Sequence, residues 1–150
     1  MSERRPWSAL WEQSREAKRN ARIELSRAVQ LAEEALREAH VACPEAHGDL
    51  ASLMNYLAAL YRETGRLDEA IATAREGLAC RRALVPRSPA LIGNDVMFLC
   101  LALWSKGSIA EALTLSEEGL SLYQEAYGPD HGEVKYVRSV VDQLRARQQK

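Results

Sequence analysis

The sequence predicts an all-α protein built from stacked helix–turn–helix repeats. Two segments, residues 57–78 and 99–120, share the same spacing of leucine, alanine and glycine and lie about 42 residues apart. A fixed period of this size is typical of chains in which each repeat is one supersecondary unit. Neither helix of such a unit can bury its apolar side alone, so neighbouring units must stack into an α–α solenoid.

Each repeat is expected to contain two amphipathic helices joined at a glycine. Apolar side chains recur at steps of three and four residues on either side of Gly65, and again on either side of Gly107. Glycine adopts the left-handed conformation that reverses a chain at a helix end with the least cost. The two glycines are therefore predicted to occupy the turns.

Proline-containing segments divide the chain into repeats, because proline cannot continue a helix. They fall in register at residues 43–48, 85–89 and 127–132. The whole chain, residues 1–150, is accordingly predicted to be one domain. Its expected parts are a degenerate first repeat at 1–43, full repeats at 49–85 and 91–127, and a C-terminal capping helix at 133–148.

The first repeat departs from the pattern because Ile23 stands where the turn glycine is expected. Apolar or small residues keep one helical phase from Leu10 to Ala39 without interruption. We therefore predict one long helix from residue 6 to about residue 42. A break near Asn20 is the alternative.

The chain resembles the tetratricopeptide repeat (TPR) family, and more narrowly the 42-residue variety found in kinesin light chains. The resemblance is carried by residues 54–61, Met-Asn-Tyr-Leu-Ala-Ala-Leu-Tyr, and by residues 126–132, Ala-Tyr-Gly-Pro-Asp-His-Gly. The first motif departs from the family pattern at Tyr56. The resemblance implies a right-handed superhelix whose concave groove is lined by the first helix of each repeat. It also implies a non-enzymatic scaffold or adaptor that binds a protein or peptide.

The resemblance places a set of residues on this groove, and Asn55 matches an asparagine that the family uses to hold an extended peptide. The predicted partner-binding residues are Asn55, Tyr56, Arg62, Asn94, Met97, Phe98, Leu101, Trp104 and Tyr136. The apolar members follow one face of a helix whose other face already supplies core residues. Such a helix is covered by another element or binds a partner. The alternative is that its apolar side chains are additional core residues.

Trp7, Leu10 and Trp11 cluster on the first turns of the predicted long helix. If that helix overhangs the repeats, the cluster is a self-association surface and the protein is a homodimer or a self-assembling subunit. The alternative is that the three side chains fold onto the next helix.

Several functional classes are disfavoured by composition and motifs. The net charge of −1 gives no basic field for nucleic acid, and no apolar run approaches the roughly 20 residues that span a membrane. Residues 1–6 lack the apolar stretch of a signal peptide, and three cysteines suit reduced thiols, which indicates a cytoplasmic protein. His40, Cys43 and His47 lack the fourth ligand of a structural zinc site. No catalytic or phosphate-binding motif is present, so we expect no enzyme, metal or cofactor.

Overall fold

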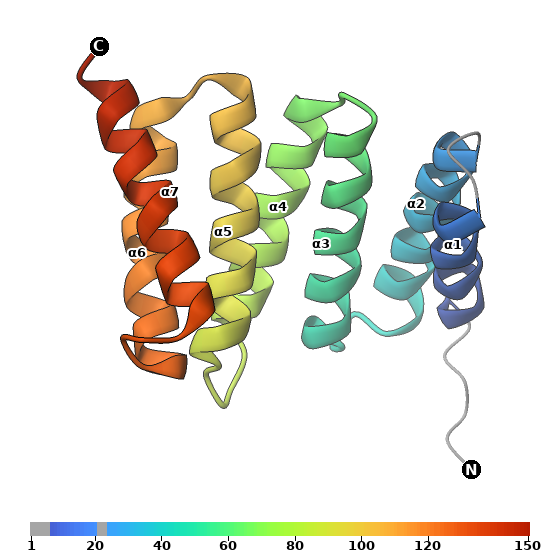
Figure 1. The fold of residues 1–150 in the computed structure, drawn as a ribbon. Helices are drawn as coiled ribbons and strands as arrows, with labels where there is room; N and C mark the ends of the chain where they lie inside the picture. Colours follow the sequence, from blue (N-terminus) through green and yellow to red (C-terminus); the bar gives the residue numbers. More distant parts are fainter. Residues whose placement is uncertain (1–6, 21–23) are drawn as a thin grey trace. The chain divides into compact units, whose positions relative to one another are not determined.

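The computed structural model describes residues 7–20 and 24–150, and this part of the chain forms α-helices with no strand (Figure 1). The helices are α1 Ser8–Asn20, α2 Leu25–Ala42, α3 His47–Glu63, α4 Leu67–Arg82, α5 Pro89–Lys106, α6 Ile109–Tyr127 and α7 Gly132–Gln148. The predicted all-α helical-repeat fold is confirmed.

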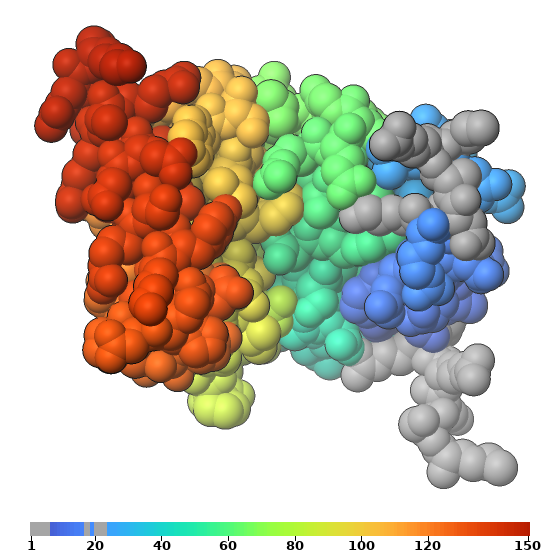
Figure 2. Space-filling model, viewed as in Figure 1, coloured from blue at the N-terminus to red at the C-terminus, as the bar shows by residue number. Residues whose placement is uncertain are grey.

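The helices group into two compact units, Met1–Cys80 and Arg81–Lys150. The first unit holds α1, α2, α3 and most of α4, and the second holds α5, α6 and α7. Figure 2 shows one face of the molecule, on which α7 and parts of α5 reach the surface of the second unit. The expectation of a single domain stays a prediction, and each unit is described by itself.

The N-terminal segment forms two helices, α1 and α2, that pack against each other. The Ser14 hydroxyl donates a hydrogen bond to the Ala28 carbonyl oxygen at 2.5 Å. In one continuous helix these residues would be about 21 Å apart along the axis, at 1.5 Å per residue. The predicted single helix from residue 6 to 42 is therefore wrong, and the alternative of a break near Asn20 is confirmed. Ile23, where the turn glycine is missing, lies outside the described residues.

The physical reason for the break is that a long unsupported helix leaves its apolar side in water, whereas a pair of helices buries it. The small side chains that suggested one uninterrupted phase allow α1 and α2 to approach closely. Ser14 and Ala28 are both completely buried at this crossing.

The predicted turn glycines both have positive φ angles, +79° at Gly65 and +90° at Gly107. Gly107 follows the last residue of α5, and its N–H bonds back to the Leu103 and Trp104 carbonyl oxygens. Gly65 bonds to the Arg62 carbonyl oxygen in the turn between α3 and α4. Both turn predictions are confirmed.

Close crossings of the helices in each full repeat depend on a second pair of glycines. A Cβ atom on Gly77 of α4 would lie 3.1 Å from the Met54 Cβ of α3. A Cβ atom on Gly119 of α6 would lie 2.5 Å from the Met97 Sδ of α5. A side chain at position 119 would displace the Met97 side chain, and one at position 77 would crowd Met54.

The second unit ends in α7, which begins one residue before the predicted capping helix and ends where it was predicted to end. Its inner side is buried along five apolar positions: Val134, Val137, Val140, Val141 and Leu144. Its other side carries exposed polar residues, and its role as a capping helix stays a prediction.

Candidate functional site

The surface of the second unit contains a row of apolar side chains on α5 that we call the α5 stripe: Leu91, Phe98, Leu101 and Trp104. Leu91 is 44% exposed, and the other three are half-buried. Leu91, Phe98 and Leu101 are spaced by seven and three residues, which places them on one side of the helix. Trp104 follows Leu101 by three residues and extends the row.

The rest of α5 is buried around most of its circumference: Ile92, Gly93, Asp95, Val96, Met97, Leu99, Cys100, Ala102 and Leu103. The helix begins where the Ser88 side chain accepts a hydrogen bond from the Leu91 N–H, with Pro89 in the first turn. It ends at Gly107.

Met97 does not belong to the α5 stripe. Only 4% of it is exposed, because its thioether lies against Gly119 of α6, where no side chain intervenes. The prediction that Met97 binds a partner is therefore wrong. Met97 is an additional core residue, which was the alternative.

Asn94 lies between the stripe and α6. Its side-chain carbonyl oxygen accepts a hydrogen bond from the Tyr123 hydroxyl at 2.5 Å. Burial raises the pKa of Tyr123 to about 12, so the phenol remains a donor at neutral pH. The exposed Asn94 amide is therefore oriented by its own chain.

Tyr136, on α7 of the same unit, is 51% exposed. Farther along α7 the Gln143 amide donates to the Ser139 hydroxyl at 3.1 Å. The role of Tyr136 in binding stays a prediction.

The predicted site residues on α3 belong to the first unit. The Tyr56 ring lies 6.4 Å from the Trp11 ring of α1, and its hydroxyl is 3.3 Å from the Ser14 hydroxyl. Tyr56 is therefore held against α1. Asn55 and Arg62 are half-buried, and their role stays a prediction.

Trp7, Leu10 and Trp11 do not overhang the repeats. Trp7 is only 2% exposed and packs in a cluster with Ala35 and Ala39 of α2 and Leu50 and Leu53 of α3. Leu10 and Trp11 pack against the same cluster. This packing favours the alternative, that the three side chains fold onto neighbouring helices, and self-association through them stays a prediction.

A buried ion pair in the second unit was not predicted from the sequence. The Arg81 guanidinium donates to the Asp95 carboxylate at 2.9 Å, and the side chains are 8% and 4% exposed. Burial raises the pKa of the Asp95 carboxyl, although the guanidinium opposes the rise. The only signal was an aspartate inside an otherwise apolar stretch.

A polar cluster in the first unit was also missed. The Tyr61 hydroxyl donates to the Glu33 carboxylate at 2.6 Å, and the Arg66 guanidinium lies 4.5 Å from the centre of the Tyr61 ring. Burial and the neighbouring Glu33 raise the pKa of Tyr61. The cluster links α2, α3 and the turn after α3, which is a structural role.

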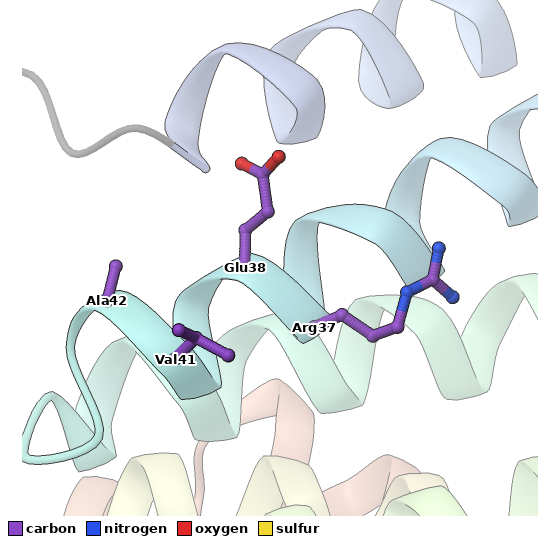
Figure 3. Close-up of a pocket in the computed structure, with 4 residues that line it drawn as sticks. All are labelled: Arg37, Glu38, Val41 and Ala42. Carbon is purple, nitrogen blue, oxygen red and sulfur yellow. The ribbon is translucent and has the colours of Figure 1, made fainter.

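A hollow on the first unit lies at the last turns of α2 and is lined by Arg37, Glu38, Val41 and Ala42. Figure 3 shows Glu38 extending toward α1, whereas Arg37 runs sideways along α2. Val41 is 86% exposed, so the hollow is open to solvent. Its side chains do not converge on a common point as the polar groups of a small-molecule site do.

Within residues 7–20 and 24–150, no group of three or more histidine, cysteine or acidic side chains is arranged to hold a metal. His40 instead places its Nδ1 atom 3.0 Å from the Leu36 carbonyl oxygen. None of the described helices is both long enough and apolar enough to span a membrane.

These features define a helical-repeat protein with a partly accessible row of apolar side chains on α5. Residues 50–90 and 101–133 match the model of the tetratricopeptide repeat family, and these two segments of the chain are tetratricopeptide repeats. Proteins of this family are generally protein–protein interaction modules, and typically they are not catalysts.

Solved structures with the same fold include a protein from Podosopora anserina assigned as a kinesin light chain with nearly identical TPR-like repeats. It matches with a TM-score of 0.79 and 19% identity over 96% of this chain and 67% of its own. BtubC (BKLC) from P. vanneervenii matches with a TM-score of 0.66 and 21% identity over 84% of this chain and 51% of its own. At these identities the likeness is one of fold. No curated protein shows significant sequence similarity to the chain.

Proposed function

We propose that the chain is a non-enzymatic adaptor that binds a segment of another protein along the α5 stripe. The observation that carries this proposal is the contrast within α5, where nine residues are buried while a row of apolar side chains stays accessible. Single exposed apolar residues are ordinary on a protein surface, but a continuous row is typical of an interaction site.

The residues of the stripe are assigned different roles. Phe98, Leu101 and Trp104 supply apolar contact area, and aromatic side chains of this kind dominate the binding energy of interfaces. Asn94 and Tyr136 supply polar groups that select the segment. Asn55 and Arg62 of α3 are proposed to take part in binding through the first unit.

Self-assembly through the N-terminal helix was favoured by the expected exposure of Trp7. Trp7 is buried within the first unit, so this exposure no longer supports self-assembly. The described cysteines Cys43, Cys80 and Cys100 are thiols without a disulfide. Free thiols fit a reducing compartment, so we assign the adaptor to the cytoplasm.

A displayed library of random peptides, selected on the full chain, tests the proposal. The dissociation constant of a selected peptide is then measured by fluorescence anisotropy for the wild type, Phe98→Ala and Trp104→Ala. We expect each variant to lose about 2 kcal/mol or more of binding free energy, as aromatic hot spots do. Helix content, followed by circular dichroism, is expected to stay unchanged.

Leu115→Ala is the matched control, because Leu115 is a half-buried apolar residue on α6 and lies outside the stripe. The control variant is expected to bind the selected peptide like the wild type. Equal losses in Leu115→Ala and Trp104→Ala would contradict the assignment of the site to α5.

A further inference from the structure

Aromatic side chains gather where α6 ends and α7 begins. The Tyr123 and Tyr127 ring centres are 5.8 Å apart, and the His131 ring stacks on Tyr127 at 4.5 Å with an interplanar angle of 19°. Tyr136 follows one turn into α7. We call these four residues the α6–α7 aromatic cluster.

The cluster is accessible and adjoins the end of the α5 stripe. Tyr127 is 42% exposed and Tyr136 is 51% exposed, while Tyr123 is buried and bonds to Asn94 of α5. Leu91, 44% exposed, precedes Asn94 by three residues on α5. An exposed aromatic face thus continues the apolar surface proposed to bind a partner.

Two carboxylates flank the aromatic cluster, Asp130 before His131 and Glu133 after it, and both are exposed. Neither forms an ion pair with another residue of the described part of the chain. Two arginines of the second unit are engaged with other carboxylates, because Arg87 pairs with Glu125 at 2.7 Å and Arg145 pairs with Glu117 at 3.1 Å.

Helix geometry sets Glu133 on the side of Tyr136 and away from the cations of α7. Residues three apart on a helix are surface neighbours, so Glu133 and Tyr136 adjoin. At 100° per residue, Lys135 and Arg138 lie about 200° and 140° around the helix from Glu133. The negative charge of Glu133 also reaches Tyr123, whose pKa it helps to raise.

The His131 ring is engaged at the start of α7. Its Nδ1 atom accepts a hydrogen bond from the Glu133 backbone N–H at 3.2 Å and thereby caps the helix. The charged side chains that flank the cluster are thus Asp130 and Glu133, and both are carboxylates.

We infer that the α6–α7 aromatic cluster, with Glu133 and Asp130, binds a lysine or arginine side chain of the partner segment. A cation over the face of a tyrosine is attracted by the ring quadrupole, and a neighbouring carboxylate adds a charge-assisted hydrogen bond. An acidic segment would meet like charge at this point. The inference rests on the proposed function for its occupant, a protein segment.

The first test uses small probes and does not depend on any selected peptide. N-acetyl-arginine amide and its neutral analogue N-acetyl-citrulline amide are added at millimolar concentrations to the isotope-labelled full chain. The arginine probe is expected to shift the nuclear magnetic resonance signals of Glu133 and Tyr136, whereas the citrulline probe leaves them in place. Glu133→Gln is expected to abolish most of the shift, while its backbone N–H still bonds to His131.

Asp142→Asn is the matched control. It removes the same charge from the same helix nine residues farther on, about 180° around the axis from Glu133. It is expected to leave the arginine response unchanged. Thermal unfolding of both variants, followed by circular dichroism, separates a lost contact from a lost fold.

The second test uses the peptides selected on the wild-type chain. They are expected to share a lysine or arginine at one fixed position, and its replacement by citrulline or glutamine should raise the dissociation constant about fivefold. If stripe-bound peptides show no such preference and the arginine probe shifts nothing, this inference is overturned while the proposed function stands. If the arginine probe binds but no peptide depends on Trp104, the proposed function fails and the cation site stands.

Discussion

The hydroxyl of Ser14 on α1 lies 2.5 Å from the carbonyl oxygen of Ala28 on α2, and both residues are completely buried. This bond joins two helices that the hydrophobic pattern presents as one. It also brings Ser14 within 3.3 Å of the Tyr56 hydroxyl on α3. Ser14 is thus in contact with groups from two other helices of the first unit.

Ser14→Ala is expected to lower the free energy of unfolding by about 0.5–1.5 kcal/mol, the usual value of a hydrogen bond in a folded chain. The loss is measured by urea denaturation. Ser26→Ala, at an exposed position of α2, is the control and is expected to change stability much less. Equal effects of the two substitutions would contradict a specific role for the Ser14 bond.

The repeat architecture was predictable because its signals are local. Gly65 and Gly107 mark turns through a backbone conformation that glycine adopts at low cost, and both have positive φ angles. The turn between α1 and α2 has no such marker at Ile23, so periodicity alone favoured one helix. A small residue such as Ser14 fits the inside of a helix pair as well as the side of a long helix.

The candidate site was predictable only in part, because the burial of a side chain on α5 depends on which side chains the facing helix carries. Phe98, Leu101 and Trp104 are accessible as expected for a surface, whereas Met97 is buried because Gly119 has no side chain. The periodicity of the α5 sequence does not reveal that α6 has no side chain at Gly119. The pair of Arg81 and Asp95 depends likewise on a contact between two helices.

Gly65→Ala is expected to destabilise the protein by about 1–2 kcal/mol, because a Cβ atom at a positive φ angle is strained. Open space does not relieve the strain, since no atom lies within 4 Å of the added Cβ position. Gly132→Ala is the matched control, with equally open space and no positive φ angle. Thermal melts that rank the two variants in the reverse order would contradict the strain argument.

Arg81→Met is expected to cost about 3–5 kcal/mol at neutral pH, because it leaves the buried Asp95 carboxylate without its guanidinium. The double variant Arg81→Met/Asp95→Leu removes both charges and should recover most of the loss. Urea denaturation of the wild type, the single variant and the double variant measures this. A double variant as unstable as the single one would show that packing, rather than charge, sets the cost.

The same pair predicts a pH dependence of stability. The folded pKa of Asp95 is raised by burial, so the folded chain holds this proton more tightly than the unfolded chain. The resulting stability is present below the ordinary aspartate pKa of about 3.9 and is lost as the pH rises through the folded value. The free energy of unfolding of Asp95→Asn, relative to the wild type, should therefore rise from acidic to neutral pH. A difference that stays constant or falls would contradict the raised pKa.

Cys100 is expected to resist alkylation in the folded chain. Its thiol is completely buried and donates to the Ala112 carbonyl oxygen at 3.2 Å, and burial raises its pKa to about 11. The reactive thiolate is therefore scarce at neutral pH. Iodoacetamide should modify the half-buried Cys43 and Cys80 first, and Cys100 only in urea, as peptide mass spectrometry can follow. Modification of Cys100 as rapid as that of Cys43 would indicate local opening of α5 from α6.

Trp7→Ala is expected to destabilise the protein by about 3–5 kcal/mol, the usual cost of deleting a large buried aromatic side chain. Trp7 is 2% exposed and packs on Leu50 and Leu53 of α3, so its loss leaves a cavity among α1, α2 and α3. Trp104→Ala is the informative comparison, because Trp104 is only half-buried. Trp104→Ala should lower the free energy of unfolding by less than Trp7→Ala does. It should weaken the binding of a selected peptide by more.

The two tryptophans therefore separate packing from binding. Urea denaturation measures the stability of each variant, and light scattering measures its mass in solution. Trp7→Ala should lower stability without changing the mass, because the side chain contacts its own chain. A variant whose mass in solution falls while its stability is unchanged would instead place Trp7 in an interface between copies. Trp7 would then no longer be assigned to the core of the first unit.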